Sequence, residues 1–551
     1  MQGTDTQGLT RTGRGILSQI VASWGARAGY WPPMVIWAPA ALVAAAMLLP
    51  LAYLIVRTVG AAPEALELLL RVRTVEILVR SFLLVTVVTA ASVAIAVPLA
   101  WLTVRTDLPL RRLWSVLTVL PLVIPSYVGG FLVVVTLGPR GMLQGLLERT
   151  VGLERLPEIY GLPGAALTIT LLTYPYVLLT VRAALWGMDP SQVEAARSLG
   201  HGPWSSFLRV TLPQLRPAVA AGAVLVALYT LSDFGAVSIL RYETFTWAIY
   251  VQYESAFDRT LAAALSLVLV GSALALLFVE GRTRGRSRYY RTAAGTSRPS
   301  PMVGLGRWRW PALALCGTVV LLALVTPVGV LGYWLARGVA AGEALRPVWA
   351  AAASSVYASA AAAVVAVVAA APVAALAVRY PGRLSALMER ATFVGFALPG
   401  IVVALALVFF GARYASPLYQ TLGLLVFAYV VLFLPLAVGA IRASLTQLSP
   451  RMEEAARSLG RRPMPVTVAV TLPLIRPGLL AGGALVFLTA MKELPATLIL
   501  SPIGFRTLAT SIWSATEGSF FAQAAAPALV LVLVSSVPMA FFLFREPGGV
   551  R

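Results

Sequence analysis

The sequence is long, apolar and basic. Its 551 residues are 59% hydrophobic and only 12% charged, whereas a soluble protein carries roughly a quarter charged residues. This composition excludes an ordinary soluble protein and predicts an integral membrane protein. We attribute the formal net charge of +21 to retention of basic loops on the cytoplasmic side of a membrane, not to binding of nucleic acid.

Three residue types exclude particular chemistries. Cys316 is the only cysteine and His201 the only histidine, so neither a disulfide framework nor a Cys or His metal cluster can form. The only lysine, Lys492, lies in Met-Lys-Glu-Leu and not in the Gly-Lys-Ser/Thr of a phosphate-binding P-loop. Since no nucleophile–base pair or HExxH motif is found either, we expect no catalytic residues, no tightly bound metal and no resident cofactor.

Apolar runs predict an all-α protein with about twelve transmembrane helices. A helix that crosses the ~30 Å hydrocarbon core needs about twenty apolar residues. Residues 1–34 contain no compact apolar core of a signal peptide, so we interpret the first run as a retained span. The twelve runs lie at 35–57, 78–104, 114–137, 163–187, 218–240, 260–280, 310–336, 351–378, 388–412, 421–446, 478–500 and 524–544.

Charge alternates between successive loops. Arginine dominates one set of loops, which includes 188–217 and 447–477, and the other set holds most of the loop acids. The positive-inside rule places the arginine-rich set and both termini in the cytoplasm. Six spans in each half return the chain to the same side, so the repeat is predicted to be parallel and not inverted.

The expected organisation follows from these spans. The segment between the two halves is rich in arginine. These arginines could keep the segment on the cytoplasmic side of the membrane or bind anionic lipid headgroups, and we favour the first explanation. The predicted parts are a cytoplasmic tail at 1–34, a first repeat at 35–280, a basic cytoplasmic linker at 281–309, a second repeat at 310–545 and a C-terminal tail at 546–551.

The most polar helix-forming stretch of each half is nearly identical in the two halves. Residues 194–200 (EAARSLG) recur at 454–460, and Thr-Leu-Pro at 211–213 recurs at 471–473, with one offset (454 − 194 = 260; 473 − 213 = 260). Each copy predicts a helix, a turn at a left-handed glycine and a second short helix. A generic amphipathic connector needs only one apolar and one polar face, so the preserved residues predict a repeated docking site.

This segment resembles the EAA loop of binding-protein-dependent ABC importer permeases. The family pattern is Glu-Ala-Ala, three residues, Gly, nine residues, a β-branched residue, any residue and Leu-Pro. Valine stands at the β-branched position, where the family usually has isoleucine. The matching residues are Glu194, Ala195, Ala196, Gly200, Val210, Leu212 and Pro213 in the first half and Glu454, Ala455, Ala456, Gly460, Val470, Leu472 and Pro473 in the second.

The resemblance implies a type I ABC importer permease in the bacterial inner membrane. In that family the loop forms a coupling helix that seats in a groove of a separate ATPase, which binds ATP and Mg. Because both copies read EAARSLG, we expect two identical ATPase chains. The family also implies an extracytoplasmic binding protein that delivers the cargo.

Most of the chain, about residues 35–545, looks like the fused two-domain permease of ferric iron importers. This resemblance rests on 231–238 (LSDFGAVS), 492–497 (KELPAT) and 286–291 (RSRYYR), and it implies ferric iron as cargo. Permeases for thiamine and other small solutes share the architecture. A secondary transporter driven by protons or sodium would also suit twelve spans, but it would not need two docking helices.

Two acidic residues are predicted inside the spans. Asp233 and Glu493 are equivalent in the repeat (493 − 233 = 260), and intramembrane acids usually face a cavity or a partner. They are candidates for a cation pathway, because carboxylates suit hard cations. Alternatively each caps a helix near the outer interface, with Glu493 paired to Lys492. Two carboxylates are too few for a tight ferric site, so affinity is expected to reside in the binding protein.

Overall fold

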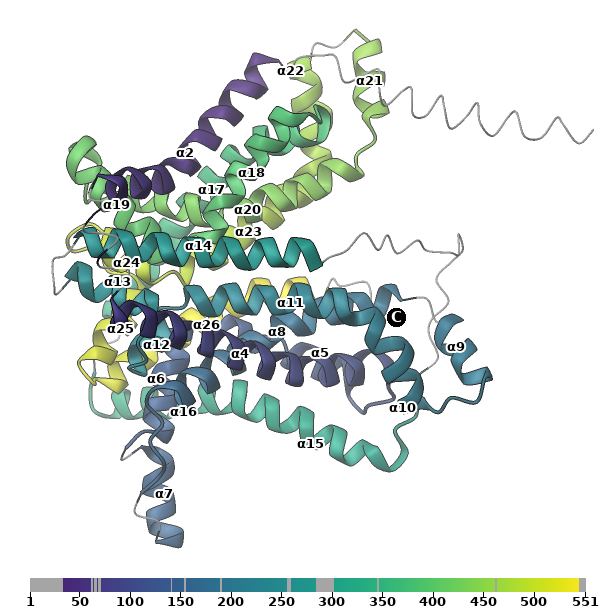
Figure 1. Ribbon diagram of the computed structural model, residues 1–551, viewed down its shortest axis with the longest axis vertical. Helices are drawn as coiled ribbons and strands as arrows, with labels where there is room; N and C mark the ends of the chain where they lie inside the picture. The colour runs from purple at the N-terminus through teal and green to yellow at the C-terminus, as the bar shows by residue number, and fades with distance from the viewer. Residues whose placement is uncertain are drawn as a thin grey trace, which may run out of the picture. The chain divides into compact units, whose positions relative to one another are not determined.

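Figure 1 shows the computed structural model, which is built from helices. It describes residues 33–544 except 61–62, 64–66, 68–70, 140, 153–154, 189–190, 255–258, 284–301, 344–345 and 461–462. Within these residues the only extended pairing is an isolated bridge between Thr106 and Val303, so the all-α prediction is confirmed. Most of the predicted N-terminal tail, most of the linker and all of the C-terminal tail lie outside the described residues.

Ten helices in the described part of the chain are long and apolar enough to cross a membrane, or eleven if one bent pair forms a single span. Helix α26 (Phe521–Phe544) adds a shorter apolar stretch at 521–536. The chain is therefore a multi-pass membrane protein.

The helices of the second half repeat those of the first in length and order. The offset of 260 found in the polar segments extends to the starts of the two long helices that flank each segment, and an earlier pair is shifted by 274 (346 − 72 = 274), so the repeat is confirmed. Matched pairs are α4 (Val72–Arg105) with α17 (Arg346–Arg379), α8 (Leu162–Gly187) with α20 (Leu422–Gln447), and α11 (Leu212–Ser232) with α23 (Leu472–Met491).

Two predicted spans are broken. The run at 114–137 divides into α5 (Arg111–Leu117), a 3-10 turn at Leu120–Val123 and α6 (Ser126–Leu137). The run at 388–412 divides into α18 (Arg383–Ala397) and α19 (Gly400–Tyr414). The prediction of unbroken spans was wrong here because Pro121, Pro125 and Pro399 lack an N–H and disfavour helical backbone in the preceding residue.

Two short helices and then a long one follow α11 in the first half and α23 in the second. The first half has α12 (Gly235–Ile239), α13 (Phe245–Glu254) and α14 (Arg259–Thr283). The second half has the corresponding α24 (Pro495–Leu500), α25 (Leu508–Glu517) and α26. The hydropathy pattern did not resolve α12, α13, α24 and α25, because they are too short to form spans.

The helices form two compact units that cut across the two halves of the sequence. One unit contains 359–396 and 429–490 together with residues up to Leu49. The other contains 50–358, 397–428 and 491 onward. The predicted repeat boundaries describe sequence repetition, whereas packing brings helices of both halves into the larger unit.

Glycines allow equivalent helix pairs to pack closely in each unit. A Cβ on Gly222 of α11 would lie 2.7 Å from Val177 Cα of α8. In the other unit, a Cβ on Gly482 of α23 would lie 3.1 Å from Ala437 Cα of α20. These are repeat-equivalent contacts (482 − 222 = 260; 437 − 177 = 260), and small residues are what lets membrane helices approach this closely.

Candidate functional site

Both repeated polar segments adopt the predicted helix, glycine turn and second helix. The first copy is α9 (Ser191–Ser198) followed by α10 (Pro203–Ser206). The second is α21 (Pro450–Ser458) followed by α22 (Pro463–Val466). Gly200 and Gly460 end the first helix of each copy with φ of 87° and 80°, the left-handed conformation that glycine adopts without steric cost.

The two copies expose the same face. Glu194 and Ala195 are exposed on α9, and Leu199 beyond them is 80% exposed. Glu454, Ala455 and Leu459 repeat this arrangement, and Leu459 is 83% exposed. An aliphatic side chain this exposed in two equivalent places makes this face a candidate docking surface, because its burial would contribute about 1.5–3 kcal/mol.

The second alanine of each motif faces the other way. Ala196 is buried and Ala456 is half-buried. The small alanine side chain lets α9 and α21 pack closely against the rest of the unit that contains each helix. The motif therefore divides into an outward pair, Glu and the first Ala, and an inward Ala.

The Leu-Pro of each motif marks a shift in helical register. A π-helical turn at Phe207–Thr211 precedes α11, and another at Thr467–Thr471 precedes α23. In these turns the N–H of Leu212 bonds to the Phe207 carbonyl, and that of Leu472 to the Thr467 carbonyl. The next residue, Pro213 or Pro473, has no N–H, so the register change costs no further hydrogen bond at that position. Neither Leu-Pro pair needs to contact a partner to explain its repetition.

The two intramembrane carboxylates cap the short helices that follow the spans. Asp233 Oδ1 accepts hydrogen bonds from the N–H groups of Ala236 (3.0 Å) and Val237 (3.4 Å) at the start of α12. Glu493 Oε1 accepts one from the N–H of Ala496 (3.2 Å) at the start of α24. A carboxylate at a helix N-terminus is stabilised by the free N–H groups and the helix dipole.

Each carboxylate also meets the first residue of a second helix. The hydroxyl of Ser126, the first residue of α6, donates a hydrogen bond to the Asp233 carboxylate. At the start of α19 the corresponding residue is Gly400, where a Cβ would collide with Glu493 Oε1. The longer acid thus lies opposite glycine and the shorter acid opposite serine. The lysine next to Glu493 donates from Nζ to the Leu122 carbonyl at 3.1 Å.

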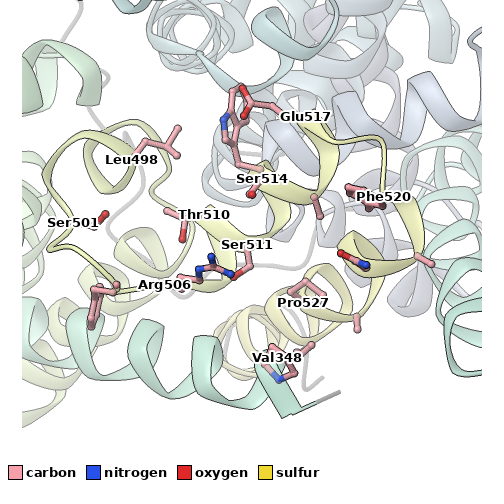
Figure 2. A pocket seen from close by; sticks show the side chains of 18 of the residues that line it. Val348, Leu498, Ser501, Arg506, Thr510, Ser511, Ser514, Glu517, Phe520 and Pro527 are labelled. Atoms are coloured by element: carbon pink, nitrogen blue, oxygen red, sulfur yellow. The ribbon is translucent and has the colours of Figure 1, made fainter. Parts of the chain in front are cut away.

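A cavity of about 1070 Å³ lies at the ends of α13 and α25 (Figure 2). Within the larger unit, α11 extends from α10 at one end to α12 at the other (Figure 1), so the cavity lies at the end of the spans away from α9. Its lining residues include three glutamates, Glu254, Glu343 and Glu517, and one arginine, Arg506.

Two of these glutamates are equivalent in the repeat. Glu254 is the last residue of α13 and Glu517 the last of α25, and both helices have ten residues. Tyr250 hydrogen bonds to Glu254, and Trp513 hydrogen bonds to Glu517. Burial raises the pKa of Glu517, and the charge of Glu254 raises it further. A carboxylate at a helix C-terminus opposes the helix dipole, so this pair concentrates negative potential at the cavity.

Comparison with known proteins connects these features to a family. The model of the family "Binding-protein-dependent transport system inner membrane component" matches residues 92–341 and 362–545. The chain belongs to this family. The two matched segments correspond to the two repeats, so the permease carries the family domain twice in one chain.

Several relatives of this permease are transport proteins of known cargo. It is 35% identical over 509 residues to the Fe(3+)-transport system permease protein FbpB 2 of Haemophilus influenzae, covering 92% of this chain and 96% of that protein. It is 26% identical to the ferric transport system permease protein FbpB of Actinobacillus pleuropneumoniae, covering 78% and 65%. Over 33% of the chain it is 31% identical to the sulfate transport system permease protein CysT of Escherichia coli, 65% of which is covered.

The sequence locates the motif residues of the permease but not the cavity. Loop charge marks Glu254 only as one of several acids, and the apolar pattern does not distinguish Glu517. A usable signal does exist: Thr244 and Thr507 begin two stretches that both end in glutamate ten residues later (507 − 244 = 263; 517 − 254 = 263). The offset differs from 260, so this equivalence is missed when a single offset is followed. The pathway role of Asp233 and Glu493 stays a prediction, since their described contacts are helix caps.

Proposed function

We propose that the chain is the transmembrane subunit of an ATP-driven importer for ferric iron. The observation that carries this proposal is the exposed face shared by the two coupling helices, with Glu194, Ala195 and Leu199 repeated at an offset of 260. The ferric cargo is supported by two relatives whose names specify it.

The proposed partners follow from the duplicated surface. Two copies of one ATPase subunit, which bind ATP and Mg, dock on α9 and α21. An extracytoplasmic binding protein delivers the cargo at the opposite end of the spans. This arrangement requires both termini and both coupling helices on the cytoplasmic side of the inner membrane. In this scheme the permease catalyses no reaction and holds no cofactor of its own.

The mechanism is a rocking motion driven from outside the chain. Closure of the ATPase dimer on ATP draws the two docked helices together, and the spans that follow them, α11 and α23, move with them. The path then opens outward to the binding protein, and hydrolysis restores the inward state. A ligand can shift such an equilibrium only if its affinity differs between the two states. The affinity of the ATPase dimer for α9 and α21 must therefore differ between the outward and the inward state.

The cavity supports a cation as cargo. Three glutamates and one arginine among its lining residues attract a hard cation and repel an anion such as sulfate. Asp233 is buried and Glu493 half-buried, and both are proposed to line the continuing path. Uptake by an Asp233→Asn/Glu493→Gln variant should fall, because both carboxylates lose their charge. Unchanged uptake and selectivity in that variant would contradict the pathway role.

Uptake of radiolabelled ferric iron by iron-starved cells that lack this gene tests the function. Wild type should restore uptake, whereas Leu199→Asp and Leu459→Asp should reduce it at least tenfold, because a charge replaces an apolar contact of about 1.5–3 kcal/mol. Leu110→Asp is the matched control, because Leu110 is also strongly exposed but lies outside the motif. Full uptake in the deletion strain, with other ferric importers removed, would contradict ferric iron as the cargo and favour thiamine or another small solute.

A further inference from the structure

The two coupling helices are joined to their own units in different ways. The difference begins at a pair of equivalent arginines, Arg105 at the end of α4 and Arg379 at the end of α17. Both helices have 34 residues and share an offset of 274 (346 − 72 = 274; 379 − 105 = 274). Their partners are equivalent only in part.

In the second half, Arg379 binds the coupling helix directly. Its Nη2 donates to Glu453 Oε1 at 2.9 Å, and Thr471 Oγ1 donates to the same oxygen at 3.1 Å. The side chains of Arg379 and Glu453 are only 17% and 14% exposed. One carboxylate thus joins α21, the end of α17 and the π-helical turn before α23.

The strength of the ion pair between Arg379 and Glu453 depends on how exposed the two side chains are to solvent. Ion pairs on the surface contribute little because water and salt screen them. A pair that is mostly withdrawn from solvent and shares a charge-assisted hydrogen bond is held more firmly, and removal of one partner leaves the other charge unpaired. The Arg379–Glu453 pair belongs to this second class.

The sequence of the first half does not allow the same junction. Val193 stands at the position equivalent to Glu453 (453 − 193 = 260) and offers no carboxylate. Both arginines donate to a carbonyl at the end of equivalent helices, Arg105 Nη2 to Leu185 near the end of α8 at 2.6 Å and Arg379 Nη1 to Leu448 just after α20 at 3.4 Å. The carboxylate contact is therefore what distinguishes the second half. Helix α9 contacts its own α11 through an exposed hydrogen bond, in which Gln214 Nε2 donates to Gln192 Oε1 at 2.7 Å.

We propose that Glu453 is a positioning residue that ties coupling helix α21 to α17, so that movement of a docked ATPase reaches α17 in the second half through the Glu453–Arg379 pair. Helix α9, with valine at this position, transmits movement to its spans without such a tie. The two halves therefore respond unequally to identical ATPase subunits. This inference rests on the proposed function, which supplies the docked ATPase.

Hydrogen exchange on the purified full-length permease tests the tie itself. Glu453→Val reproduces the first half and should speed amide exchange in 450–458 by about tenfold or more, because a charge-assisted hydrogen bond is lost. Val193→Glu is the converse variant and should slow exchange in 191–198 by giving Arg105 a carboxylate. Glu389→Gln is the control, because it removes another ion pair of this unit, with Arg442, without altering either coupling helix. Unchanged exchange in Glu453→Val would overturn the inference.

Transport per ATP tests the transmission. In proteoliposomes that contain the permease, its ATPase and the loaded binding protein, Glu453→Val should keep ATP hydrolysis but lose about tenfold in ferric ions moved per ATP. The charge-swapped pair Glu453→Arg/Arg379→Glu should recover much of this loss, which a merely folding-deficient variant could not do. Normal coupling in Glu453→Val would refute the inference alone, whereas wild type without ATP-driven ferric uptake would refute the proposed function.

Discussion

Asp233 and Glu493 show how single residues are matched to their surroundings. Glu493 is longer than Asp233 by one methylene group. The helix that faces Glu493 begins with the smaller residue, Gly400, and the helix that faces Asp233 begins with the larger residue, Ser126. Both acids accept backbone N–H groups at the start of a short helix. The longer acid therefore lies opposite the smaller residue, and the shorter acid opposite the larger one.

This matching predicts non-additive effects of substitution. Gly400→Ser should lower the free energy of unfolding by about 1–3 kcal/mol, because the added side chain collides with Glu493. Glu493→Asp should also destabilise, since the shorter acid reaches Ala496 less well. The double variant recreates the first-half arrangement and should cost about 1 kcal/mol less than the sum of the two. Thermal unfolding of the purified protein in detergent measures all three; strict additivity would show that the two positions are independent.

At the scale of elements, the coupling helices depend on the left-handed glycine that ends each of them. Among the described residues, and apart from the two neighbours in the chain, no heavy atom lies within 4 Å of a Cβ added to Gly200 or Gly460. This part of the folded chain therefore has room for a side chain there. The backbone conformation opposes one, and under the proposed function a docked ATPase would oppose one too.

Asparagine separates these two factors because it tolerates the left-handed conformation. Gly460→Asn should leave the free energy of unfolding within about 1 kcal/mol of wild type, yet it should weaken binding of the ATPase by adding a side chain to the docking face. Gly152→Asn is the matched control, since Gly152 also has positive φ and open space around it in the described structure but lies outside the coupling segments. Pull-down of the ATPase with each variant is the measurement, and equal binding would place Gly460 outside the contact.

At the scale of the whole molecule, packing does not follow the two halves of the sequence. The larger unit combines helices of the first half with α19, α24, α25 and α26 of the second. The cavity is a product of this arrangement, because it takes Glu254 from one half and Glu343 and Glu517 from the other.

The charge of the cavity should depend on external pH. The pKa of Glu517, which lies outside the spanning helices, is raised by burial and by Glu254. Glu517 therefore takes up its proton at a higher pH than an ordinary glutamate, and the cavity loses negative charge as pH falls. Ferric uptake should decline on acidification, and less so in Glu517→Gln, which has no charge to lose. The ratio of the two uptake rates in proteoliposomes across external pH isolates this effect; a constant ratio would contradict it.

Local composition and repetition are enough to establish several features of this permease. Apolar runs place the spans because the hydrocarbon core requires about twenty apolar residues in any fold. The offset of 260 identifies both repeated polar segments, and Gly200 and Gly460 indicate the turn because a left-handed backbone favours glycine. These inferences need no knowledge of which helices pack together.

Contacts between residues far apart in the chain depend instead on how the helices pack. Asp233 meets Ser126, Lys492 meets Leu122, and Glu453 meets Arg379, and no local pattern specifies any of these pairs. The broken spans at 114–137 and 388–412 belong here too, because proline is tolerated in some membrane helices and breaks others, according to whether neighbouring groups satisfy the freed carbonyls. Repetition reveals equivalent positions in the two halves, but packing determines which of those positions meet.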